Sequence, residues 1–208
     1  AVPGVVVIPV LIVPVLANAD RLYQMLNTID HEVRTLIVID NGEVVSQHRL
    51  TETNRAYIGR RHLLRMPTNL GVASSWNLGI KATPFAPWWL VANFDVQWPM
   101  GSLDRFAAEA GPDRLLLSGG APPWCVFAIG EQVVSQVGLF DEGLHPAYWE
   151  DIDYRRRCDL HGVTVVESDI DVWHANSSTL AAGYHDRNLE TFAPNAERAS
   201  LRAARGDL

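Results

Sequence analysis

The sequence predicts an α/β fold, a three-layer α/β/α sandwich with a mostly parallel central sheet. Along the first half of the chain, oily β-branched runs alternate with segments whose apolar residues recur at helical spacing. Strands that alternate with helices in this way form a parallel sheet with helices on both faces. Polar, Gly-rich segments follow the strands, and such sheets bind ligands beyond the carboxyl ends of their strands. We therefore expect the functional residues directly after each strand.

The expected elements follow one another without a linker or an internal repeat. Each assignment rests on β-branched runs for strands and on a shared apolar face for helices. In order, they are a strand over Val10–Val15, a helix over Asp20–Ile29, a strand over Val33–Ile39, a short strand over Leu63–Met66, a helix over Ala73–Ala82 and a strand over Trp88–Asp95 that runs into a loop.

The N-terminal stretch "VVVIPVLIVPVLANAD" has two interpretations. Its apolar run ends in Ala17-Asn18-Ala19, which resembles the cleavage site of a secretory signal peptide. A signal peptide needs a basic start, however, and the first basic residue is Arg21, after that site. Three prolines also break a run that is shorter than the roughly 20 residues of a membrane span. We expect a buried central strand and no transmembrane segment.

Composition indicates an ordinary soluble domain. The 208 residues fit a single domain over 1–208, and 48% of them are apolar. The net charge of −7 argues against a sheath of nonspecific phosphate contacts. The two cysteines, Cys125 and Cys158, form no disulfide framework and no C-x-x-C pair, which favours a reducing, cytoplasmic location.

Neither common phosphate-binding loop is present. The chain contains no G-x-x-x-x-G-K-[ST] motif and no G-x-G-x-x-G after the first strand. A bound nucleotide would therefore be held in another way, for example by a carboxylate on the base and a metal ion on the phosphates.

Several motifs together resemble the family 2 glycosyltransferases of GT-A fold, especially the branch that includes rhamnosyltransferases. These are inverting enzymes that use a nucleotide-diphosphate sugar. The resemblance covers about 12–178 of the chain and rests on the order of the motifs. They are "IVPVLANADRL", "LIVIDNG", "NLGVASSWNLGI", "ANFDVQWP", "GLFDEGL" and "YWEDIDYRRRCDLHG".

The resemblance implies a donor nucleotide half at about 10–98, an acceptor half at about 99–178 and a C-terminal helical tail at about 179–208. Uridine or thymidine diphosphate sugars are favoured, because a carboxylate at Asp40 can accept the imide N–H of either base. The alternative role of Asp40 is to cap the turn that Asn41-Gly42 predicts. The residues expected at the nucleotide are Pro14, Val15, Leu16, Asp40, Asn69, Gly71, Asn77 and Asn93.

A divalent cation, Mn²⁺ or Mg²⁺, is the implied cofactor. Asn93-Phe94-Asp95 matches the D-x-D position of the family, with an amide in place of the first carboxylate. Asp95 is the expected ligand, because a cation with oxygen ligands can bridge a carboxylate and a diphosphate. His174 matches the histidine with which some members complete the metal site, although a lone histidine is often structural.

The stretch "YWEDIDYRRR" places an acid pair at the expected start of a helix. Acids near a helix N-terminus and bases further along suit the helix dipole, which explains the pattern without any function. The resemblance implies instead that Asp151 removes the proton of an acceptor hydroxyl, with Glu150 as the second candidate. Trp124 and Trp149 are candidate sugar platforms, and Arg157 is a candidate for holding a carboxylate or phosphate.

The acceptor remains open among a glycan, a lipid-linked sugar, a protein and a modified nucleobase. Three other functions are alternatives to the transferase. A sugar nucleotidyltransferase should show a Gly-rich, basic loop after the first strand, and "PVLANADRL" does not. A sugar-nucleotide-binding protein without transferase activity would keep Asp40 and lose the acid pair. A generic Rossmann-like binding protein would explain the fold and leave the motif order to coincidence.

Overall fold

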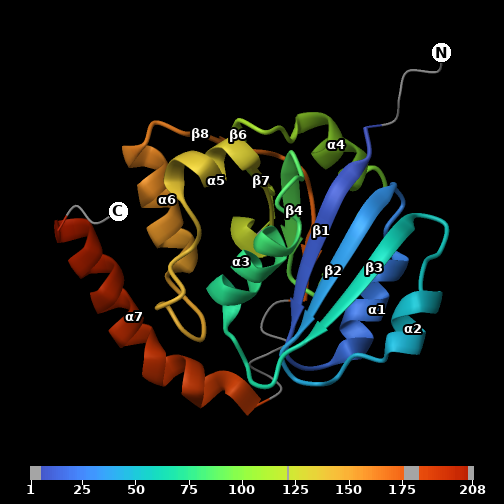
Figure 1. The fold of residues 1–208 in the computed structure, drawn as a ribbon, viewed down its shortest axis with the longest axis horizontal. Helices are drawn as coiled ribbons and strands as arrows, with labels where there is room; N and C mark the ends of the chain where they lie inside the picture. Colours follow the sequence, from blue (N-terminus) through green and yellow to red (C-terminus); the bar gives the residue numbers. More distant parts are fainter. Residues whose placement is uncertain (1–5, 121, 176–182, 206–208) are drawn as a thin grey trace.

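The centre of the molecule is a seven-stranded mixed sheet with strand order β3-β2-β1-β4-β7-β6-β8 (Figure 1). The computed structural model describes residues 6–120, 122–175 and 183–205. Most neighbouring strands are parallel, and β7 (Val126–Gly130) runs antiparallel to both of its neighbours. The predicted α/β sandwich with a mostly parallel sheet is confirmed.

Strand β1 (Ile8–Val15) is the N-terminal apolar stretch, and it lies inside the sheet between β2 (Val33–Asp40) and β4 (Trp88–Ala92). All of its residues except Pro14 are buried. A strand covered on both faces needs a continuous apolar sequence, which is what this segment supplies. The prediction of a buried central strand is confirmed.

Strand β3 (Ile58–Arg65) forms one edge of the sheet and is longer than the short strand expected at Leu63–Met66. Its first half reads "IGRRH", and most of these side chains are exposed or half-buried. An edge strand can carry basic residues, which also discourage pairing with another sheet. The hydrophobic pattern therefore predicted only the apolar C-terminal part of β3. The remaining strands of the sheet are β6 (Arg114–Leu117) and β8 (Thr164–Glu167).

Two apolar clusters, one on each face, hold the helices against the sheet. The first contains residues of α1 (Ala19–Asn27), α2 (Gln47–Glu52) and α4 (Ser102–Glu109). The second contains residues of α3 (Val72–Ala82), α5 (Glu131–Val137) and α6 (Glu150–Leu160). Helix α3 approaches β1 closely at Gly79, where an added Cβ would lie 2.6 Å from the Ile12 side chain.

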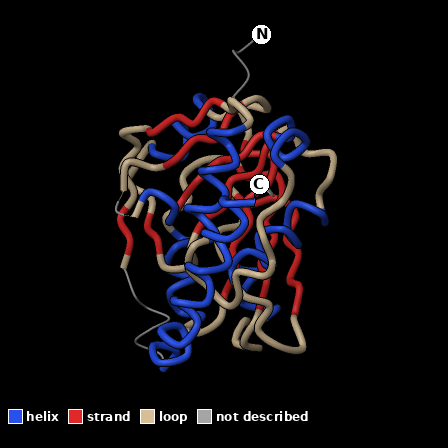
Figure 2. Tube along the Cα trace, turned by 90° about the vertical axis from the view of Figure 1, so that its left-hand side faces the viewer, coloured by secondary structure: helices blue, strands red, loops and turns tan. Residues whose placement is uncertain are grey.

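Two further features lie outside the central sheet. A short antiparallel pair joins β5 (Val96–Gln97) to β9 (Trp173–His174). Helix α7 (His185–Arg205) lies along the side of the molecule next to α6 (Figure 1), and Figure 2 shows it crossing that side. No helix in the described ranges is both long enough and apolar enough to cross a membrane.

Candidate active site

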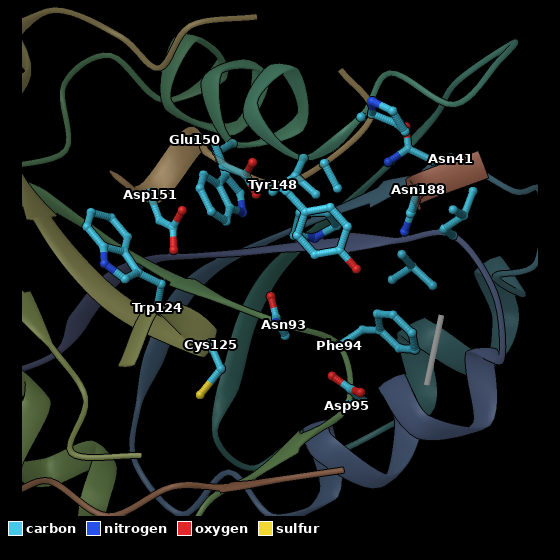
Figure 3. Close-up of a pocket in the computed structure, with 18 of the residues that line it drawn as sticks. Asn41, Asn93, Phe94, Asp95, Trp124, Cys125, Tyr148, Glu150, Asp151 and Asn188 are labelled. Carbon is cyan, nitrogen blue, oxygen red and sulfur yellow. The ribbon is translucent and has the colours of Figure 1, made fainter. Parts of the chain in front are cut away.

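Most of the residues singled out in the sequence line one pocket of about 310 Å³ at the carboxyl ends of β1, β2 and β4 (Figure 3). This is the position at which open α/β sheets bind their ligands. Of the expected site residues, the pocket brings together Pro14, Val15, Leu16, Asn69, Gly71, Asn93, Asp95, Trp124, Glu150, Asp151 and His174.

The pocket wall between β1, β2 and α3 is built by Asn41. Its amide nitrogen donates to Ser75 Oγ at 2.9 Å, its Oδ1 accepts from Leu70 N–H at 3.1 Å, and its backbone N–H donates to Val15 O at 2.7 Å. The "DNG" turn thus ties the ends of two strands to the start of α3. Because these contacts span three elements, they fix the shape of this wall.

Gly71 marks the place where α3 begins against a distant loop. Its φ is +82°, and an added Cβ would lie 2.8 Å from Pro146 O. The next residue, Val72, donates its N–H to Pro146 O at 2.8 Å. A residue with a side chain would both strain the backbone and push this loop away. Gly71 therefore joins the first half of the chain to the segment that precedes the acid pair.

Asp40 is fully buried and does not line the pocket. Its Oδ1 accepts from Gly42 and Val44 N–H, and its Oδ2 accepts from Val45 N–H at 3.0 Å. The carboxylate thus closes the turn after β2, the alternative role that the turn sequence indicated. Both oxygens of this carboxylate are therefore engaged by the backbone of its own turn.

Asn77 and Arg157 lie within the protein and not at the pocket. The amide of Asn77 donates to Phe140 O and accepts from Phe140 N–H at 3.0 Å. The guanidinium of Arg157 donates to Asp153 Oδ2 at 3.0 Å and to the carbonyls of Val137 and Leu139. Both side chains bind the segment between α5 and α6, which gives each a structural role.

Trp149 is the residue before α6 and does not line the pocket. Its backbone is left-handed, with φ of 76°, and its ring packs against Phe192 of α7 at 5.7 Å between centroids. Trp124, by contrast, lines the pocket near Asp151 (Figure 3).

The candidate metal ligands meet across the β5–β9 pair. His174 Nε2 lies 3.0 Å from Asp95 Oδ1 and 3.3 Å from the amide nitrogen of Asn93. His174 Nδ1 is buried and has no hydrogen-bond partner. In the described ranges, no three His, Cys, Asp or Glu side chains group closely enough to hold a metal ion on their own.

The two members of the acid pair have different surroundings. Glu150 is buried, and its Oε2 has no hydrogen-bond partner. Burial, with the nearby charge of Asp151 as a smaller contribution, raises the pKa of Glu150 to about 8. Asp151 is half-buried, and its Oδ1 accepts from the Ile152 N–H at 2.8 Å. At neutral pH the pair therefore contains one protonated acid and one accessible carboxyl group.

Sequence reasoning missed several residues that line the pocket. Tyr148 lies in the middle of the view in Figure 3, and Asn41 and Asn188 lie at the end away from Asp151. Tyr148 precedes the acid pair by two positions, which is a usable local signal. Asn188 lies in α7 and gives no local signal, because only tertiary packing brings that helix to the pocket. Asn41 and Phe94 lie in the segments after strands where functional residues were expected, although neither was given a role of its own. The other lining residues not expected are Val72, Trp76, Pro122, Cys125, Pro146 and Ala147.

No protein-family profile matches the sequence, and no curated protein matches it at a significant level. Solved structures do match. S. aureus TarS superposes with a TM-score of 0.62 at 14% identity, over 79% of this chain and 36% of TarS. TarS 1-349 in complex with UDP superposes with a TM-score of 0.61 at 15% identity, over 79% of this chain and 59% of that one.

A third solved structure, GalNAc-T7 with UDP, GalNAc and Mn²⁺, superposes with a TM-score of 0.60 at 10% identity, over 81% of this chain and 44% of GalNAc-T7. The chain thus spans between 36% and 59% of the length of these proteins. At such identities the likeness establishes the fold, which is that of GT-A glycosyltransferases. It does not single out the rhamnosyltransferase branch.

Proposed function

We propose that this chain is a glycosyltransferase that moves a sugar from a uridine or thymidine diphosphate sugar to an acceptor hydroxyl. One observation carries the proposal. In a GT-A fold, a single pocket at the carboxyl ends of the strands holds the Asp95–His174 pair and the Asp151 carboxyl group. The similarity to structures that contain UDP or UDP-GlcNAc supports a nucleotide-sugar donor.

The donor nucleotide would lie between the end of β1 and the Asn41 end of the pocket. Pro14, Val15 and Leu16 supply an apolar wall there, and Asn69 and Gly71 supply backbone at the start of α3. Asn188 lies at the same end (Figure 3). Its side-chain amide can both donate and accept, which is what the edge of a uracil or thymine requires.

A divalent cation, Mn²⁺ or Mg²⁺, fits the donor set at Asp95 and His174. A carboxylate oxygen and an imidazole nitrogen suit such ions, although Mg²⁺ favours oxygen more strongly than Mn²⁺ does. Since the described residues offer no third acidic or imidazole ligand, the diphosphate of the donor would complete the site. Asn93 would then orient His174, which its amide contacts. When bound, the cation would offset the negative charge of the departing diphosphate.

Asp151 is the proposed general base. The acceptor oxygen attacks the anomeric carbon as the bond from that carbon to the diphosphate breaks. The acceptor proton passes to Asp151, and the electron pair of the broken bond leaves with the nucleotide diphosphate. Direct displacement inverts the anomeric carbon. Glu150 is unsuited to the role at neutral pH, because its raised pKa keeps it protonated. Trp124, beside Asp151 in the pocket, offers a ring face to a sugar.

The test is a screen of sugar nucleotides for thermal stabilisation, followed by an assay of nucleotide release. Uridine and thymidine diphosphates and their sugars are compared with adenosine and guanosine counterparts, each with Mn²⁺ and with a chelator. A ligand that binds only the folded state raises the unfolding temperature by mass action. If the chain is a transferase, we expect a sugar nucleotide to raise its unfolding temperature in a metal-dependent way. We also expect slow release of nucleotide from one donor in water.

The alternatives give different results in the same experiment. A binding protein without activity would be stabilised and would release no nucleotide, even with candidate acceptors present. A nucleotidyltransferase would release pyrophosphate from a nucleoside triphosphate and a sugar phosphate. A chain that no sugar nucleotide stabilises would contradict the proposed function.

A further inference from the structure

Helix α7 holds the segment that leads into the acid pair. This segment, residues 141–149, runs from the end of the α5 connection to the first turn of α6. Within it, Tyr148 and Trp149 have left-handed backbones, with φ of 74° and 76°. Such conformations are costly for residues with large side chains, so surrounding contacts must maintain them.

Asn195, a buried residue in the middle of α7, contacts the backbone carbonyls of this segment. Its amide nitrogen donates to Ala147 O at 2.9 Å, and it lies 3.4 Å from Tyr148 O and 3.5 Å from His145 O. One side-chain amide thus faces the carbonyls of three residues that precede α6.

Three further side chains of α7 contact the same segment. Arg198 forms a bidentate ion pair with Asp141, with distances of 2.7 and 2.9 Å, and Arg202 reaches Asp141 at 2.7 Å. Burial would raise the pKa of Asp141, but the two guanidinium groups and the Gly143 N–H hold it well below its usual range. At the other end of the segment, the Phe192 ring packs on both Tyr148 and Trp149.

The segment and the first part of α7 both reach the pocket. Tyr148, Glu150 and Asp151 all line it, and Figure 3 shows the Tyr148 ring between Glu150 and Phe94. Asn188, from the first part of α7, lines it as well. Any shift of the Tyr148–Trp149 backbone would therefore move a ring inside the pocket and the first turn of α6.

We propose that Asn195 is a positioning residue of the active site. By holding the carbonyls of His145, Ala147 and Tyr148, it fixes the left-handed backbone that aims Tyr148 into the pocket and sets the place of Asp151. Helix α7 then positions residues of the active site, in addition to packing beside α6. The effect on turnover rests on the proposed function, whereas the effect on the segment does not.

The experiment compares Asn195→Asp, Asn195→Ala and Ser200→Ala with the parent chain. Aspartate keeps the size of asparagine but cannot donate to a carbonyl when ionised. Alanine removes the hydrogen-bond donor without adding charge. This variant replaces the aspartate variant in the comparison if the latter does not fold. Ser200→Ala is the control, because among the described residues its hydroxyl bonds only to Ala196 O within α7. Hydrogen exchange of the amides in residues 141–149 and the kinetics of donor hydrolysis are measured for each.

Both Asn195 variants are expected to exchange the amides of residues 141–149 faster by about tenfold, the effect of losing one hydrogen bond. The kcat of donor hydrolysis should fall roughly 10- to 100-fold, the scale of a small misplacement, while KM for the donor stays within about threefold. The control should match the parent in both measurements. A merely structural asparagine would leave kcat unchanged well below the unfolding temperature.

Two results would overturn the proposal: unchanged exchange in residues 141–149, or unchanged kcat with faster exchange. If the parent hydrolyses no donor, the proposed function fails separately. The exchange measurement then still decides whether Asn195 holds this segment.

Discussion

His174 Nε2 lies 3.0 Å from Asp95 Oδ1, although 79 positions of the chain separate the two residues. The β5–β9 pair produces this approach, because it aligns His174 with Val96, the residue after Asp95. Both side chains are almost inaccessible, 7% exposed for His174 and 5% for Asp95. The carboxylate and the imidazole therefore form a buried, hydrogen-bonded pair at the pocket wall.

The first prediction concerns this pair. Uridine or thymidine diphosphate should stabilise the parent more with Mn²⁺ than without it, and Asp95→Ala should erase that difference. The physical reason is that the variant removes the one negatively charged protein ligand proposed for the cation. The measurement is the unfolding temperature with nucleotide, with and without Mn²⁺.

Asp113→Ala is the control for this experiment. Asp113 pairs with Arg114 on the surface and does not line the pocket. It should respond to metal as the parent does. If Asp95→Ala also keeps the parent response, the metal assignment is wrong.

The second prediction tests whether Asp151 is a general base or only an acidic residue at the N-terminus of α6. Asp151→Asn should lower transfer, or donor hydrolysis as its proxy, by roughly 10²- to 10⁴-fold, the scale of general-base catalysis. Nucleotide binding should persist, and the free energy of unfolding should fall by less than about 2 kcal/mol, because within the described part of the chain Asp151 accepts only a local backbone bond. Steady-state kinetics and denaturant unfolding measure the two effects.

Asp159→Asn on the same helix is the matched control, since Asp159 is exposed and pairs with Arg155. It should leave turnover within about twofold of the parent, as expected for an exposed ion pair. An Asp151→Asn protein with parental turnover would remove Asp151 from the mechanism.

The third prediction concerns Glu150 and pH. Burial raises its pKa from 4.5 in the unfolded chain to about 8 in the folded protein. Between these values the folded state holds a proton that the unfolded state has lost. Glu150 should therefore make the free energy of unfolding fall as pH rises through this window, by at most about 1.4 kcal/mol per pH unit.

Glu150→Gln has no such proton to lose, so its stability should change less between about pH 5 and pH 8. Urea unfolding of parent and variant across this range measures the difference. The Glu150→Gln variant should lose less turnover than Asp151→Asn does, because Glu150 is not the proposed base. Parallel stability profiles for the two proteins would show that Glu150 ionises normally.

The fourth prediction concerns the central strand. Val13 is fully buried in β1, so Val13→Asp should abolish soluble folding, since an unpaired buried charge costs several kcal/mol or must be neutralised. Val6→Asp is the control, because Val6 is 54% exposed just before the strand. Soluble yield and circular dichroism of the two variants provide the test. A well-folded Val13→Asp protein would contradict the buried position.

The sequence alone determined the features that depend on neighbouring residues. The β-branched residues of Val10–Val13 predicted the buried strand, and "YWEDIDY" placed an acid pair at the start of a helix, where α6 begins at Glu150. The polar segments after the strands predicted the edge of the sheet at which the pocket lies. These signals are local, because strand and helix periodicity and turn chemistry are set over a few residues.

Only the tertiary structure decided where each polar side chain finds its partners. The Asp40 carboxylate accepts from the backbone of its own loop, and the Arg157 guanidinium donates to a carbonyl between α5 and α6. The sequence around each residue was also compatible with ligand binding. Asn188 lies in α7 and lines the pocket, although it does not follow any strand of the sheet. The physical reason is that a buried polar group must be satisfied by whichever partner the fold brings near, and that partner is set by contacts between distant parts of the chain.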